Sequence, residues 1–214
     1  MLFLFGPLAI LIQTACAGQV SDRYELAFSP YLGGSQFEHI RDICADSEGN
    51  VYGVWHDPLN AKNPHRNSWP DKSWFANAFR KSPKGGEGDF GVVKISADGR
   101  RCIWATYLTG SGKETGAGSV RVASDGSVYT ETWTFSNDMP TTEGAYDRTH
   151  NGGADYYVAR LTSDGSELIF GTYIGGSGEE IHSTHNLAID ELGNAYVSVW
   201  TPYGETAFAH PTWL

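Results

Sequence analysis

The densest group of potential metal ligands in this chain is His182 and His185, which closely follow Glu180. Imidazole and carboxylate groups are ligands that zinc takes in proteins. On a β-strand, residues three apart face opposite sides, so only a loop conformation would bring both imidazoles to one ion. The sequence therefore leaves two interpretations open, a metal site formed by Glu180, His182 and His185 or a solvated loop, and it favours the loop.

A second group of oxygen ligands lies in Asp-containing segments at residues 46–50, 98–99, 124–127, 164–165 and 190–194. Calcium needs several oxygen ligands that converge on one point, and none of these segments has the DxDxDG density of a dedicated calcium loop. Gly, Asn and Asp are also the residues that tight turns require for positive φ. The segments are interpreted as turns, so no cofactor is expected and calcium is kept as the alternative.

The signals for catalysis are weak. The chain has seven histidines, but it has no GxSxG motif and no Cys beside a suitable His partner. Glu131 and Glu143 are available as a carboxylate pair for glycoside chemistry, which depends on the distance between the two groups. Nothing in the sequence selects these two residues, so we expect that the protein is not an enzyme.

The most distinctive segment is residues 56–88, which is rich in aromatic side chains. Exposed indoles can stack on a sugar or a peptide, and nearby polar groups then fix its orientation. The candidate ligand-binding residues are Trp69, His65, Arg66, Trp74 and His56. The alternative is that the aromatic residues fold back as a small core over the adjacent strands. We expect Trp69 to be exposed at the apex of this segment and Trp74 to be largely buried.

These candidates lie on a repeated sequence. Tyr31, Tyr107 and Tyr173 begin the motifs YLGGS, YLTGSG and YIGGSG, and a Gly-Asn or Gly-Ser turn with an aromatic strand follows each of them. The tyrosines are 76 and then 66 residues apart, which places an insertion of about ten residues in the first copy. Self-similarity at a fixed spacing is typical of repeat architectures.

Each copy contains four short apolar runs separated by Asp-Gly, Gly-Asn or Gly-Gly signals, a pattern that predicts strands joined by tight turns. In the second copy the predicted strands are residues 120–123, 128–133, 156–161 and 168–173. No run of ten or more residues has a 3.6-residue period, which argues against a helical solenoid. Four antiparallel strands per repeat are typical of the blades of a β-propeller.

Four motifs strengthen this interpretation: TYIGGSG, DELGNAYV, MPTTEGAY and DYYVARLTSDGS. Together they resemble the bacterial SBBP repeat family of seven-bladed β-propellers, over roughly residues 26–214 and best between 107 and 200. The resemblance implies a ring of four-stranded blades, usually in exported proteins, and it implies no catalytic residues. The first copy departs from the pattern, because SWFANAF stands where the second copy has PTTEGAY.

We therefore expect an all-β, propeller-type array over residues 22–214, with a leading strand at 26–31. Blade repeats are expected near residues 40–107, 117–173 and 185–214. About two and a half blades do not close a ring, which takes roughly four to eight. The remaining blades are expected from a longer reading frame or from other copies of the chain. The repeated aromatic residues of the strands should occupy equivalent places in successive blades.

Residues 1–17 form an apolar run that is short for a membrane span and ends at Ala15-Cys16-Ala17, as signal peptides do. Ordinary cleavage, lipidation at Cys16 and a retained segment are all open. The protein is therefore expected to be exported, as an extracellular, periplasmic or outer-membrane-anchored protein, with membrane contact only through a lipid anchor.

The formal net charge of −10 and the pI near 5.0 argue against a nucleic-acid partner, which needs a basic surface. The function expected from the sequence is a scaffold or binding module for a protein or a carbohydrate. The alternative is a propeller-fold hydrolase or lyase with its site in the central channel.

Overall fold

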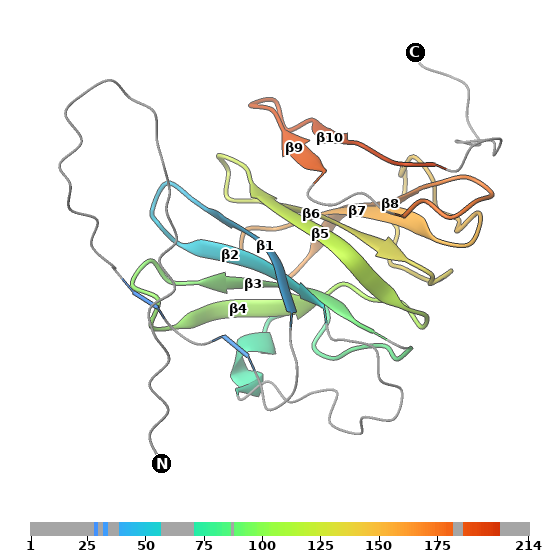
Figure 1. Cartoon of the computed structure of the whole chain (residues 1–214). Helices are drawn as coiled ribbons and strands as arrows, with labels where there is room; N and C mark the ends of the chain where they lie inside the picture. Colours follow the sequence, from blue (N-terminus) through green and yellow to red (C-terminus); the bar gives the residue numbers. More distant parts are fainter. Residues whose placement is uncertain are drawn as a thin grey trace.

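The computed structural model describes residues 28–29, 32–33, 39–56, 71–86, 88–181 and 186–201, with only the backbone described for residues 115–117. This part of the chain consists of β-strands, turns and one short 3-10 helix, η1 (Figure 1). The elements in chain order are β1 (His39–Ala45), β2 (Val51–His56), η1 (Lys72–Phe75), β3 (Phe90–Ile95), β4 (Cys102–Tyr107), β5 (Glu114–Val122), β6 (Val128–Thr134), β7 (Asp155–Leu161), β8 (Leu168–Ile174), β9 (Leu187–Ile189) and β10 (Ala195–Val197).

The strands form antiparallel sheets in which each strand pairs with its neighbour in sequence. Strands β1–β4 form one four-stranded sheet, β5–β8 form a second, and β9 pairs with β10 (Figure 1). The predicted all-β array of four-stranded antiparallel blades is thereby confirmed. Strands β6, β7 and β8 agree with their predicted bounds to within one residue at each end.

Strand β5 differs from its prediction, because it begins at Glu114, six residues before the predicted start. Its pairing with β6 is irregular between Thr115 and Gly118, where the register shifts. The intervening sequence TGAGS contains no large apolar residue. The backbone pairing therefore continues where the alternation of apolar and polar residues, on which the prediction depends, is missing.

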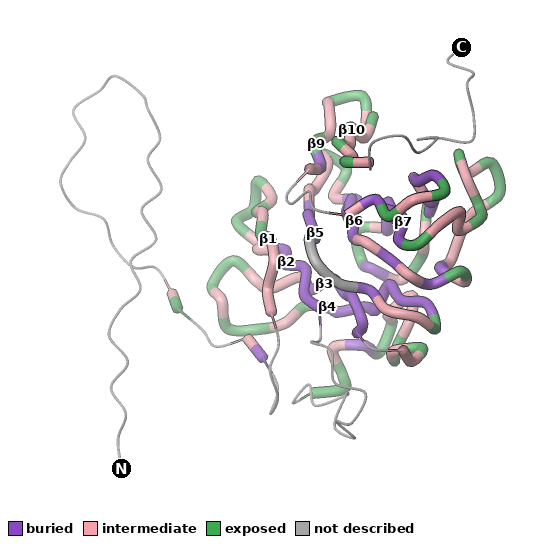
Figure 2. Tube along the Cα trace, turned by 45° about the vertical axis from the view of Figure 1, so that its right-hand side comes forward, coloured by how far each residue is buried: buried purple, intermediate pink, exposed green. Residues whose placement is uncertain are grey.

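The first strands of successive sheets lie side by side: β1 and β2 contact β5, and β5 contacts β9. The main core lies between the two four-stranded sheets and joins Tyr52, Val54 and Val92 to Val120 and Val128. Among the strands, the middle ones, β2, β3, β6 and β7, carry most of the buried residues (Figure 2). Each large apolar side chain buried in this way contributes about 1.5–3 kcal/mol.

The repeated tyrosines of the second strands occupy equivalent places. Tyr52 and Tyr129 are fully buried, and each lies edge-on to an aromatic ring of its own fourth strand, Trp104 and Phe170, at 6.3 Å between centroids. This confirms the predicted equivalence for the two four-stranded sheets. The third member, Tyr196 in β10, is 56% exposed.

Phe28, which precedes the first sheet, packs on a turn glycine of that sheet in the same way as Trp104 packs on a turn glycine of the second sheet. A Cβ atom at Gly165, in the β7–β8 turn, would lie 2.6 Å from the indole of Trp104. A Cβ atom at Gly99, in the β3–β4 turn, would lie 2.3 Å from the ring of Phe28. The contact of Phe28 with the first sheet is therefore equivalent to the contact of Trp104 with the second sheet.

The connection from the second to the third strand of each sheet runs along the outer strand. Arg80 N–H donates to Thr106 Oγ1 at 3.0 Å, and Arg80 O accepts from Tyr107 N–H at 3.1 Å. Asp147 makes the same two hydrogen bonds to the equivalent residues of β8, at 2.9 and 3.0 Å. These contacts cover part of an edge that would otherwise recruit other strands.

Candidate functional site

The structure describes two of the five residues that the sequence predicts as ligand-binding, His56 and Trp74. His56 ends β2 and is 6% exposed. Trp74 lies in η1, is half-buried and packs against the cluster of Trp55, Phe75 and Tyr107. Trp69, His65 and Arg66 lie outside the described residues, so their role stays a prediction.

Around η1, the segment between β2 and β3 folds back on the first sheet. Asp71 caps η1, because its carboxylate accepts from Ser73 N–H at 2.8 Å. Phe75 is buried, stacks on Tyr107 at 5.1 Å and lies edge-on to Trp55 at 6.4 Å. This part of the segment therefore has a small core of its own, as the alternative interpretation proposes.

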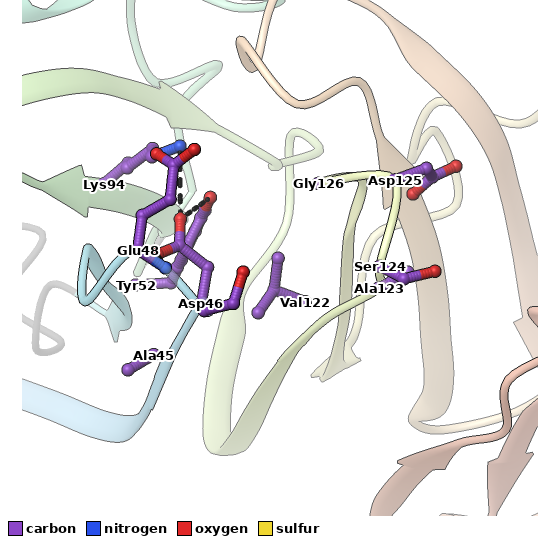
Figure 3. Close-up of a pocket in the computed structure, with 11 residues that line it drawn as sticks. Ala45, Asp46, Glu48, Tyr52, Lys94, Val122, Ala123, Ser124, Asp125 and Gly126 are labelled. Carbon is purple, nitrogen blue, oxygen red and sulfur yellow. Dashed lines mark hydrogen bonds and ion pairs between the residues drawn. The ribbon is translucent and has the colours of Figure 1, made fainter.

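A cleft of about 410 Å³ opens where the β1–β2 turn of the first sheet faces the β5–β6 turn of the second (Figure 3). Its charged lining residues are Asp46, Glu48 and Lys94 on one side and Asp125 on the other. A volume of this size lies within the range of small-ligand sites, roughly 300–1,000 Å³. The sequence analysis missed this cleft, because the two turns that form it are almost 80 residues apart in the repeat pattern.

The first wall of the cleft is held by hydrogen bonds to Asp46. Tyr52 OH donates to Asp46 Oδ2 at 3.1 Å, and Lys94 Nζ lies 3.6 Å from the same oxygen (Figure 3). The Lys94 ammonium also lies 4.9 Å from the centre of the Tyr52 ring. Burial acts to raise the pKa of Asp46, but the hydrogen bonds from Asn50 and Tyr52 and the charge of Lys94 outweigh it and lower the pKa.

The second wall is held in a similar way. Asp125 accepts from Ser127 N–H at 2.9 Å and from Arg160 Nη2 at 2.8 Å. The hydrogen bonds from Ser127, and next the charge of Arg160, lower the pKa of Asp125. Because the pKa values of Asp46 and Asp125 are both lowered, both stay ionised at neutral pH, which suits binding rather than proton transfer.

The Asp-containing segments behave as tight turns. Asp46, Asp125 and Asp190 each accept a hydrogen bond from the backbone N–H two residues later. A glycine with φ near +80° follows in each turn, at Gly49, Gly126 and Gly193. The carboxylate oxygens that calcium would need are thus engaged within their own turns.

Buried carboxylates lie at the links between successive sheets, and the sequence analysis named only Glu180 among them, as a candidate metal ligand. Glu114 is fully buried and accepts hydrogen bonds from the hydroxyls of Thr109, Thr134 and Ser136. Burial raises the pKa of Glu114, although these hydrogen bonds act to lower it. Glu180 holds the same position in the next repeat and is 1% exposed. The signal available in the sequence was the glutamate that ends both SGKE and SGEE.

Of the two glutamates considered for glycoside chemistry, Glu131 is fully buried and Glu143 is exposed. Glu131 Oε1 accepts from Ser119 Oγ at 2.9 Å. Burial raises the pKa of Glu131 to about 7. The difference in exposure gives no support to a joint catalytic role for these two residues.

His182, His185 and Cys16 lie outside the described residues, so the metal and lipidation hypotheses stay predictions. Among the residues that are described, no three His, Cys, Asp or Glu side chains form a metal-binding group. The same residues contain no helix with the length and apolar character needed to cross a membrane.

A protein-family model described as SBBP, beta-propeller repeat, matches residues 169–201. This match runs from β8 through the sheet of β9 and β10. The chain therefore contains a repeat of this family, as the resemblance of its motifs predicted. No curated protein and no solved structure matches the chain.

Proposed function

We propose that this chain, which carries a β-propeller repeat at residues 169–201, is an exported binding module that takes a protein ligand at the cell surface or outside. A repeat of this family favours a scaffold or binding module, because its blades present surfaces and turns for recognition. Export is supported by the apolar residues 1–17 and the small-residue step at Ala15-Cys16-Ala17.

The observation that carries the proposal is the cleft between the first two blades. Its lining places the carboxylates of Asp46, Glu48 and Asp125 against the single ammonium of Lys94. Hydrogen bonds fix Asp46 and Asp125 before any ligand arrives, which reduces the entropy lost on binding. Lys94 pairs with Asp46 and Arg160 pairs with Asp125, so the excess negative charge comes from Glu48, and it favours a protein segment with lysine or arginine over a neutral carbohydrate.

Binding of the full chain to peptide and glycan arrays tests this proposal. We expect capture of basic peptides, weakened by salt and weakened several-fold by Glu48→Gln. Glu143→Gln is the matched control, because Glu143 is an exposed glutamate that does not line the cleft. Equal loss in both variants, or capture of neutral glycans that Glu48→Gln leaves unchanged, would reject the basic-peptide assignment. Carbohydrate is the alternative ligand class.

Export is tested separately with the full chain and its Cys16→Ser variant. Both should leave the cytoplasm if residues 1–17 are a signal peptide. Partitioning of the parent chain into the detergent phase, while the Cys16→Ser variant stays in the aqueous phase, would identify lipidation at Cys16. Retention of both chains in the cytoplasm would contradict export.

The alternative function is a hydrolase or lyase with its site in the central channel. The observation in its favour is the raised pKa of Glu131, about 7, since perturbed carboxyl groups gather at catalytic sites. Glu131 is fully buried, however, and a general acid must reach its substrate. The binding module is therefore the better-supported function.

A further inference from the structure

The first and third sheets share a turn that the second sheet lacks. In the turn between β1 and β2, the Asp46 carboxylate accepts from two backbone N–H groups, from an asparagine amide and from Tyr52 OH, which is 3.1 Å away. In the turn between β9 and β10, Asp190 accepts from the same four positions, the last of them Tyr196 OH at 2.9 Å. In both turns the aspartate therefore holds the hydroxyl of the tyrosine six residues later.

The second sheet has Ala123 at the position of this aspartate, six residues before Tyr129. Alanine has no side-chain acceptor, and Tyr129 OH donates instead to the backbone carbonyl of Gly193 at 2.8 Å. Because Gly193 lies between β9 and β10, this hydrogen bond crosses from the second sheet to the third. The residue type at one position thus decides whether the tyrosine stays in its own turn or crosses to the next sheet.

The gap between the first and second sheets has an equivalent acceptor. Gly126, with φ of +80°, is the counterpart of Gly193, with φ of +83°. A Cβ atom on Gly193 would lie 3.1 Å from Tyr129 OH, but the Tyr52 hydroxyl lies more than 4 Å from the same position on Gly126. A phenol has one proton to donate, and Tyr52 donates it to Asp46 (Figure 3). The Gly126 carbonyl is therefore left to another donor.

The charge of Asp46 explains why Tyr52 stays in its own turn. A hydrogen bond to an ionised carboxylate is roughly twice as strong as one to a neutral carbonyl. Although burial acts to raise the pKa of Asp46, the hydrogen bonds from Asn50 and Tyr52 lower it overall, so the carboxylate is ionised at neutral pH. Tyr52 therefore prefers Asp46 to the Gly126 carbonyl.

We propose that Asp46 is a positioning residue that keeps the cleft open by holding the Tyr52 hydroxyl in its own turn, and that a bound basic peptide donates an N–H to the Gly126 carbonyl in place of the tyrosine. The role of Gly126 rests on the proposed function, because the peptide and the cleft are the same. The peptide meets a charged acceptor on one wall, Glu48, and a neutral acceptor on the other, Gly126. Lysine and arginine side chains carry several N–H donors, and the peptide backbone supplies more.

Crystal structures of two variants test the role of Asp46 without any peptide. Asp46→Ala gives the first turn the alanine of the second, so Tyr52 OH should move to within about 3 Å of Gly126 O. Ala123→Asp makes the reverse exchange, so Tyr129 OH should leave the third sheet for the new carboxylate. The proposal is overturned if Tyr52 OH stays more than about 3.5 Å from Gly126 O in the first variant, or if Tyr129 OH still bonds to the third sheet in the second.

Calorimetric titration of the full chain with tetralysine separates the tyrosine hydroxyl from the aspartate charge. Asp46→Ala should weaken binding at least about tenfold, because it closes the cleft and removes a negative charge. Asp46→Ala/Tyr52→Phe has no hydroxyl to close the cleft, so it should bind about three to ten times more tightly than Asp46→Ala. Asp46→Ala/Tyr129→Phe is the matched control, because it removes the tyrosine hydroxyl of the other gap, and it should stay as weak as Asp46→Ala.

The two measurements distinguish this proposal from the proposed function. Equal binding by Asp46→Ala and Asp46→Ala/Tyr52→Phe would overturn the positioning role. A parent chain that binds no tetralysine would overturn the proposed function and the acceptor role of Gly126. In that case, Tyr52 OH on Gly126 O in the structure of Asp46→Ala would still confirm the positioning role of Asp46.

Discussion

The indole of Trp104 donates its N–H to the backbone carbonyl of Ser163 across 3.1 Å, and so joins the outer strand of the first sheet to the β7–β8 turn of the second. The same indole lies against Gly165 in that turn. Trp104 is 6% exposed, although it belongs to the outermost strand of its sheet. The contact therefore fixes how the second blade sits on the first.

Replacing Trp104 should separate its packing from its hydrogen bond. Trp104→Ala should lower the free energy of unfolding by about 3–5 kcal/mol, because it leaves a cavity between the sheets. Trp104→Phe keeps an aromatic ring, as Phe170 does in the second sheet, and should lose about 1 kcal/mol for the hydrogen bond to Ser163. Urea denaturation of the three chains gives both differences. Equal losses in the two variants would contradict a packing role.

Gly165 should resist substitution for two reasons. Its φ is +69°, and a Cβ atom would lie 2.6 Å from the Trp104 ring. Gly144 has a similar φ of +77° but has open space around it. Gly144→Ala should therefore destabilise by about 1 kcal/mol, from backbone strain alone. Gly165→Ala should destabilise by about 1–3 kcal/mol more, and thermal denaturation of both variants measures the difference.

The strands were predictable because local signals mark them. Alternating apolar residues and Asp-Gly or Gly-Asn turns fixed β6, β7 and β8 to within one residue. The start of β5 was missed, since TGAGS carries no such signal. The cleft and the burial of Glu114 were also missed, because the turns of the cleft, and the hydroxyls of Thr134 and Ser136 that reach Glu114, come together only when the chain folds.

The aromatic residues of η1 should differ in their effect on stability. Phe75 is 5% exposed and stacks on Tyr107, so Phe75→Ala should cost about 3 kcal/mol or more. Trp74 is half-buried, so Trp74→Ala should cost less. If Trp74 also contacts a ligand, its substitution weakens binding while circular dichroism shows intact sheets. A larger loss of stability for Trp74→Ala than for Phe75→Ala would show that the tryptophan is the main anchor of this segment.

The buried carboxyl group of Glu131 should make stability depend on pH. Burial raises its pKa from 4.5 to about 7, so the folded chain binds this proton more tightly than the unfolded chain does. Its contribution is fully present below pH 4.5 and is lost as the pH rises to 7, by on the order of 3 kcal/mol at most. Asp155, with a pKa raised by burial to about 6, acts in the same direction over a lower range.

Glu131→Gln tests this dependence, because glutamine keeps the shape of the side chain but does not titrate. Its free energy of unfolding, measured in urea with EDTA at pH 4.5, 6 and 7.5, should fall less with rising pH than that of the parent chain. Glu143→Gln is the control, since Glu143 is exposed, and it should keep the parent slope. If the free energy of unfolding changes equally with pH in the parent chain and in Glu131→Gln between pH 4.5 and 7, the pKa of Glu131 is not raised by folding. Glu131 would then be ionised in the folded chain. Its charge would then be balanced by Arg121, whose positive charge acts to lower the pKa of this carboxyl group.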